Sequence, residues 1–184
     1  ESYSSPSAAD YDNDGNLDLF FTTVYGVASF GRKNNPVLFR NEGQFKFSNV
    51  NTLTKLEGLG ATYQAAWADF DNDGDLDLMT AGRFFVNNGN KNNHWLRIKL
   101  EHNKKNINRF AIGAQVRLAL SNGKTISRQV ESGTGQGNQN ELTLHFGLGS
   151  YDQPVEVEVF WPDGTILNRG GIAVDQKFIL NPNN

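Results

Sequence analysis

An acidic stretch that occurs twice decides the fold. Residues 9–19 read A-D-Y-D-N-D-G-N-L-D-L, and residues 68–78 read A-D-F-D-N-D-G-D-L-D-L, with Asp69 lying 59 residues after Asp10. Each copy runs into a short apolar segment, residues 17–24 and 76–81, which soon meets Gly26 or Gly82. Short runs rich in β-branched and aromatic residues predict strands.

Other strands repeat with the same period. Residues 37–43 resemble residues 84–89, and each looks like a strand that runs into an Asn/Gly turn. Residues 44–50 alternate and predict the hairpin partner of the first, and residues 65–68 predict a strand that enters the second acidic loop. A period near 60 residues with about four strands has the size of one β-propeller blade with long loops.

The pattern changes after an Asn-rich stretch. Residues 87–93 hold five Asn and one Gly, and we place a domain boundary there, between 1–91 and 92–184. Apolar residues then alternate with polar ones in residues 96–100, 116–120, 142–146 and 155–160, with hairpin turns expected at 121–124 and 162–165. The predicted fold is therefore all-β, with about two propeller-type blades followed by a β-sandwich or barrel of roughly six to eight strands.

Composition narrows the classes of function. The 184 residues include no cysteine, which excludes disulfide scaffolds, cysteine-ligated metal sites and thiol nucleophiles. The formal net charge is −3, and neither half is basic enough to indicate a nucleic-acid partner. No apolar run reaches the roughly 18 residues that a membrane span needs.

The acidic stretches share the spacing D-x-D-x-D-G-x-x-D. Carboxylates at alternate positions of a tight loop can face one centre, and Gly15 and Gly74 permit the positive φ that such a turn needs. Ca²⁺ takes six to eight oxygen ligands, so we predict two Ca²⁺ sites, closed by a bidentate Asp at position nine and a carbonyl at position seven. The predicted ligands are Asp10, Asp12, Asp14, Asn16 and Asp18 in the first site, and Asp69, Asp71, Asp73, Asp75 and Asp77 in the second.

These loops differ from EF-hands. An EF-hand has Glu at position twelve and flanking helices, whereas Phe21 and Thr80 occupy that position here and strands flank both loops. The alternative is a pair of solvated Asp/Asn-rich turns without an ion. Four carboxylates held so close repel one another, so a bound cation is the more economical interpretation.

Other candidate sites are weaker. The Gly-rich residues 133–139 lack phosphate-loop spacing and are expected to connect strands. His94, His102 and His145 show no metal-ligand spacing, and the alternation around His145 predicts a surface position. Glu156 and Glu158 share one strand face. For these residues a place on a solvated surface is favoured over a role in acid–base catalysis.

Together these motifs resemble known families. The two acidic loops with their strands, and Leu38-Phe-Arg-Asn-Glu-Gly43, resemble FG-GAP/VCBS repeats, the calcium-loop blades of integrin-α-type β-propellers. The second half resembles the ASPIC/UnbV domain that follows such repeats in the cartilage acidic protein family and its bacterial relatives. That resemblance rests on segments such as Ile112-Gly-Ala-Gln-Val116, Leu144-His-Phe-Gly-Leu-Gly149 and Val157-Glu-Val-Phe-Trp-Pro-Asp-Gly164. Members often carry an aromatic residue where this chain has Gln136.

The resemblance implies a Ca²⁺-stabilised module of extracellular, cell-surface or periplasmic proteins, and it implies no catalytic residue here. We expect a non-catalytic protein-interaction or adhesion module that forms the C-terminal part of a larger propeller protein or assembly. Other protein chains or further blades are expected along the strand edges of 1–91, particularly at residues 17–24 and 65–68. The alternatives are a glycan-binding module and the terminal region of a propeller-type enzyme whose active site lies outside this chain.

Overall fold

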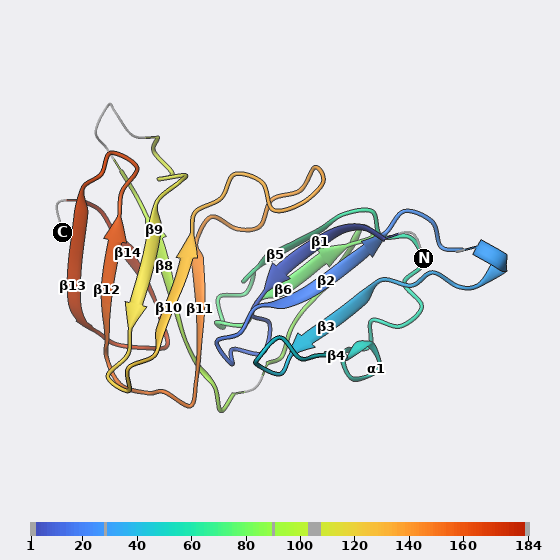
Figure 1. Ribbon diagram of the computed structural model, residues 1–184, viewed down its shortest axis with the longest axis horizontal. Helices are drawn as coiled ribbons and strands as arrows, with labels where there is room; N and C mark the ends of the chain where they lie inside the picture. The colour runs from blue at the N-terminus through green and yellow to red at the C-terminus, as the bar shows by residue number, and fades with distance from the viewer. Residues whose placement is uncertain (1–2, 28, 90, 103–107, 183–184) are drawn as a thin grey trace. The chain divides into compact units, whose positions relative to one another are not determined.

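The computed structural model describes residues 3–27, 29–89, 91–102 and 108–182. It confirms an all-β fold built from several sheets, and the chain divides into two compact units (Figure 1). Unit 1 comprises residues 1–11, 16–89 and 133–141, and unit 2 comprises residues 12–15, 90–132 and 142–184. Whether 1–91 and 92–184 fold independently stays a prediction.

Unit 1 contains two antiparallel sheets that follow chain order. The first sheet holds β1 (Tyr3–Ala9), β2 (Asp18–Thr23), β3 (Val37–Asn41) and β4 (Phe47–Asn49). The second holds β5 (Ala65–Ala68), β6 (Asp77–Thr80) and β7 (Arg83–Phe85). A short 3₁₀ helix (Ser29–Gly31) lies in the β2–β3 connection, and helix α1 (Asn51–Thr54) follows β4.

The two sheets of unit 1 share one apolar core. Phe20 and Leu38 come from the first sheet, and Trp67 and Leu78 come from the second. The rings of Phe20 and Trp67 meet edge to face with centroids 6.4 Å apart, a favoured aromatic geometry. The acidic loops join β1 to β2 and β5 to β6, so this packing places both loops at strand ends.

The edges of the unit 1 sheets differ from expectation. The strand predicted at residues 17–24 is β2, which pairs with both β1 and β3, so its edges are not open. The strand at 65–68 is the edge strand β5, and residues 133–141 cover it. Asn140 Oδ1 accepts from the backbone N–H of Trp67 at 3.1 Å, and the backbone N–H of Glu141 donates to the Trp67 carbonyl at 2.9 Å.

The same segment also reaches β1. The Gln136 N–H donates to Ser5 Oγ at 3.0 Å, and Asn140 Nδ2 donates to the Ala8 carbonyl at 3.3 Å. Gln136 therefore takes part in packing within unit 1. The predicted strand connection at 133–139 is confirmed, since it joins β10 to β11.

Unit 2 is a sandwich of two sheets with seven strands in its described part, within the predicted six to eight. One sheet has the order β10-β9-β12-β13 and is antiparallel; the other has the order β11-β8-β14, in which β14 runs parallel to β8. The strands are β8 (His94–Leu100), β9 (Gln115–Ala119), β10 (Thr125–Gln129), β11 (Leu144–Gly149), β12 (Val155–Phe160), β13 (Ile166–Ile172) and β14 (Gln176–Leu180).

Turn chemistry and alternation explain the larger sheet of unit 2. Residues 121–124 join β9 to β10, and the Leu120 N–H donates to the Lys124 carbonyl at 2.9 Å. Residues 162–165 join β12 to β13 with the equivalent bond from Trp161 to Thr165, also at 2.9 Å. Both predicted hairpins are confirmed, and the alternate residues of β9 and β12 enter a core with Leu96, Ile98 and Phe146.

Candidate metal centres

Strand ends position the two acidic loops in the same way. Asp10 directly follows β1 and Asp18 begins β2; Asp69 directly follows β5 and Asp77 begins β6. Three carboxylates converge in each loop: one oxygen each from Asp10, Asp12 and Asp18, and one each from Asp69, Asp71 and Asp77, lie within 4.8 Å of one another. Positions one, three and nine of both repeats therefore meet, as a shared ion requires.

The loops also share an unusual backbone. Asn13 and Asn72 have φ of 60° and 61°, and the glycines that follow two residues later have φ of 90° and 92°. A side chain is strained at such angles, which explains Gly15 and Gly74. Gly15 has a second reason, because a Cβ there would lie 3.0 Å from the Gly147 carbonyl oxygen.

The aspartate at position nine closes each loop through backbone hydrogen bonds. One oxygen of Asp18 accepts from the Tyr11 N–H at 3.2 Å, and the other accepts from the Asn41 N–H at 2.8 Å. Asp77 does the same with Phe70 at 2.9 Å and Asn87 at 2.8 Å. Both carboxylates are almost fully buried. They connect the loop start to the end of the third strand of each repeat.

Sequence reasoning missed Asn41 and Asn87 as part of these loops. Their side-chain oxygens accept from Gly43 and Gly89, each at 3.1 Å. Their side-chain amides donate to the carbonyls of Leu17 at 3.1 Å and Leu76 at 3.2 Å. The signal is present in the sequence, since both lie in the similar Asn-x-Gly turns at 41–43 and 87–89.

The remaining predicted ligands are placed less uniformly. Asp14 and Asp73, at position five, lie outside the two three-carboxylate groups. Asp73 Oδ1 accepts from the Asp75 N–H at 2.9 Å, and the Asp75 side chain lies against Gly89. The ligand roles of Asp14, Asn16, Asp73 and Asp75 stay predictions, as does the bidentate role of Asp18 and Asp77.

Electrostatics favour a cation in the second loop. Burial, with the neighbouring Asp73 and Asp69 carboxylates adding to it, raises the pKa of Asp75 to about 6. Burial is also the main cause that raises the pKa of Asp73. Both shifts show that negative charge is unfavourable in this loop, and a dication would offset it. The converging donors are all carboxylate oxygens, which suit a hard ion such as Ca²⁺.

Comparison with known proteins agrees with this organisation. Residues 10–80 match the family described as FG-GAP-like repeat, and residues 104–184 match the family described as ASPIC and UnbV. The chain carries FG-GAP-like repeats followed by an ASPIC/UnbV domain. The FG-GAP-like match spans both acidic loops, and the ASPIC/UnbV match spans β9 to β14. Neither family description names a catalytic activity.

Three relatives share sequence similarity with most of the chain. The chain is 32% identical to cartilage acidic protein 1 of Homo sapiens over 180 residues, which cover 94% of this chain and 27% of the relative. The mouse protein of that name is 32% identical over 192 residues, covering 97% and 29%. The Xenopus tropicalis protein is 33% identical over 171 residues, covering 88% and 26%. The chain thus spans less than a third of the length of these relatives.

Histidine placement corrects one expectation in the ASPIC/UnbV domain. His145 is buried, not at the surface, and its Nε2 bonds Asn13 Oδ1 at 2.6 Å. Because an amide oxygen only accepts, this nitrogen carries the proton. Burial, with Arg97 and Arg128 adding to it, lowers the pKa of His145 to about 3. Within the described residues, neither it nor His94 or His102 joins a group of three potential metal ligands.

In the described part of the chain, no helix is long and apolar enough to cross a membrane.

Proposed function

We propose that this chain is a non-catalytic, Ca²⁺-stabilised module for protein interaction or adhesion, extracellular, at the cell surface or periplasmic. The observation that carries the proposal is the duplicated loop, in which three carboxylates converge at the same positions twice. Two Ca²⁺ ions would change the formal charge of the chain from −3 to +1. The similarity to cartilage acidic protein 1 supports a place outside the cytoplasm, where Ca²⁺ is abundant.

The energy expected from Ca²⁺ is large enough to measure. Extracellular Ca²⁺ modules bind with dissociation constants of about 10⁻⁴–10⁻³ M. At about 1 mM Ca²⁺, mass action then stabilises the folded chain by about 0.4–1.4 kcal/mol for each site. Two sites contribute about 1–3 kcal/mol, a substantial share of the stability of a small domain.

The test is calorimetric titration of metal-stripped protein with Ca²⁺, combined with melting curves in Ca²⁺ and in EGTA. We expect two binding events and a higher melting temperature in Ca²⁺. Asp71→Asn should remove one event, whereas Asp152→Asn, the same charge change at an exposed residue outside both loops, should remove none. Identical melting curves in Ca²⁺ and EGTA would count against the proposal.

The surfaces for protein contact are proposed to be the outer faces and edges of unit 1. Strands β4 and β7 are the outer edge strands of their sheets. Phe84 of β7 and Phe70 stack edge to face with centroids 4.0 Å apart, yet each is about half exposed, and Met79 of β6 is 46% exposed. Apolar faces of this kind suit further blades or another protein chain.

The contact proposal is tested by light scattering. We expect the chain to associate with itself or with a fragment supplying neighbouring blades, and the double variant Phe84→Ser, Met79→Ser to reduce that association. A monodisperse monomer that binds no such fragment would refute this part of the proposal.

A glycan-binding role is the second candidate, because unit 1 has a polar groove with aromatic walls. The groove has a volume of about 580 Å³, and its lining includes Tyr3, Phe39, Asn34, Asn35 and Asn49. Aromatic faces cover the apolar side of a sugar ring, and amides bond to its hydroxyls. Glycan-array binding that survives Asp71→Asn and Phe45→Ala but is lost in Tyr3→Ala would favour this role over protein adhesion.

A further inference from the structure

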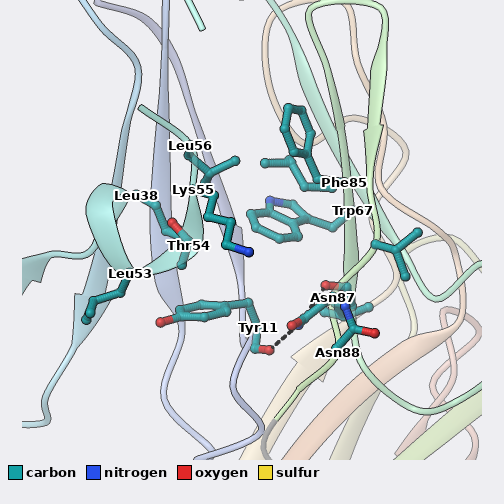
Figure 2. Close-up of a pocket in the computed structure, with 13 residues that line it drawn as sticks. Tyr11, Leu38, Leu53, Thr54, Lys55, Leu56, Trp67, Phe85, Asn87 and Asn88 are labelled. Carbon is teal, nitrogen blue, oxygen red and sulfur yellow. Dashed lines mark hydrogen bonds between the residues drawn. The ribbon is translucent and has the colours of Figure 1, made fainter. Parts of the chain in front are cut away.

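A separate cavity of about 300 Å³ lies in unit 1, and none of the converging carboxylates lines it. One wall comes from the first sheet and helix α1, with Leu38, Leu53 and Leu56, and the opposite wall comes from the second sheet, with Trp67 and Phe85 (Figure 2). Its size is at the lower end of small-molecule pockets, and its mainly apolar walls with few polar groups are typical of them.

The Trp67 side chain supplies a buried donor at this cavity. Only 4% of Trp67 is exposed, and its indole Nε1 has no hydrogen-bond partner among the residues that the structure describes. Burying an N–H group without an acceptor is unfavourable, so such groups are rare in native structures and call for an explanation. An acceptor atom of a bound ligand would satisfy it.

The rim of the cavity adds a positive charge. Lys55 ends α1 in the left-handed conformation with φ of 58°, which is uncommon for a residue with a side chain. Its side chain extends from the α1 wall toward Trp67 (Figure 2), and it forms no ion pair within the described part of the chain. The neighbouring Leu53 is 77% exposed, so the rim is apolar and cationic together.

We propose that this cavity binds a small carboxylate with an apolar aromatic or branched aliphatic body. The body occupies the space between Leu38 and Phe85, and the carboxylate accepts from Lys55 at the rim and from the Trp67 indole N–H. Leu76 and Leu78 contribute further apolar lining. The proposed ligand contacts none of the converging carboxylates, although the lining includes Tyr11, Leu76 and Asn87 beside them, so the test is made at a fixed Ca²⁺ concentration.

The probe pair is 4-phenylbutyrate and its uncharged amide, tested by calorimetry on the full chain in 1 mM Ca²⁺. We expect the carboxylate to bind more tightly than the amide. Lys55→Gln should weaken carboxylate binding about two- to fivefold, the range of a solvent-screened ion pair, and abolish the preference over the amide. Lys46→Gln, an exposed lysine in the β3–β4 turn, is the matched control and should change neither.

Proton–nitrogen NMR tests the role of Trp67 directly. The chain has three tryptophans, so it gives three indole N–H signals, and Trp67→Phe identifies one of them by its loss. We expect that signal to shift on addition of 4-phenylbutyrate, while the other two report an intact fold. Absence of binding, equal binding to Lys55→Gln, or a shift confined to the other two signals would overturn the proposal.

Discussion

Asp77 accepts two backbone hydrogen bonds and is also a predicted Ca²⁺ ligand, and a pair of variants can separate these two roles. In Asp77→Ala, the N–H groups of Phe70 and Asn87 lose their acceptor, so we expect about 2–4 kcal/mol lower stability even in EGTA. One Ca²⁺ event should also disappear. Asp71→Ala is the control, because Asp71 belongs to the same carboxylate group but is exposed and receives only a long 3.3 Å bond from Asp73.

Chemical denaturation in EGTA and calorimetry in Ca²⁺ measure the two effects. Asp71→Ala should lose the ion while remaining close to wild-type stability without metal. If both variants lose equal stability in EGTA, Asp77 has no structural role beyond that of Asp71, and the position-nine argument is wrong.

His145 predicts an acid-sensitive fold. Its neutral form is held in the native state, with Nδ1 facing no acceptor among the described residues and Arg97 and Arg128 nearby. Because the native pKa is about 3 and the unfolded value is about 6.5, the unfolded state binds more protons between these values. Stability therefore falls as pH falls below 6.5, by about 2 kcal/mol at pH 5 from this residue.

Denaturation of wild type and His145→Gln at pH 7 and pH 5 measures this effect. The wild type should lose about 2 kcal/mol more than the variant over that interval. Equal losses would show that the pH dependence comes from other groups.

At the residue scale, the sequence predicted the converging aspartates but not how His145 is surrounded. The spacing of acidic residues is local, so it specifies the loop. Strand alternation predicts one buried and one exposed face, yet the burial of β11 is nearly continuous, because Asn13 approaches its second face. A contact between residues 132 positions apart leaves no local signal.

Residues 133–141 cover the edges of β1 and β5 in unit 1. Asn140→Ala removes the acceptor of the Trp67 backbone N–H and a donor to the Ala8 carbonyl. We therefore expect a loss of about 1–3 kcal/mol in the stability of unit 1. Gln139→Ala is the control, since Gln139 is exposed and its neighbour carries the contacts. Hydrogen exchange at Trp67 should accelerate in the first variant alone; unchanged exchange there would contradict the assigned role.

At the element scale, hydrophobic pattern predicted most strands and missed those without one. β1 has the sequence Tyr-Ser-Ser-Pro-Ser-Ala-Ala, in which Tyr3 is the one large apolar residue. It is held instead by pairing with β2 and by the Ser5 N–H bond to Thr22 Oγ1 at 3.1 Å. β14 (Gln-Lys-Phe-Ile-Leu) was also not predicted, although it contains apolar residues; its parallel partner β8 lies about 80 residues earlier in the chain.

At the scale of the whole molecule, we expect the second half of the chain to fold without the first. Every buried residue of the unit 2 core lies between Leu96 and Leu180. We therefore expect the fragment 92–184 to fold with or without Ca²⁺, because its core needs no acidic loop. Circular dichroism and a cooperative melt of that fragment are the measurements; an unfolded fragment in both conditions would show that the predicted boundary or the independence is wrong.

The covered edge of β5 has a consequence for biosynthesis. A ribosome finishes β7 well before it makes residues 133–141, and the delay is about 2–10 s at about 5–20 residues per second. During that interval the newly made blades expose the backbone groups of β1 and β5 that Asn140 and Glu141 later cover. Because unpaired strand edges recruit other chains, we expect nascent chains at this stage to be the form most prone to aggregate.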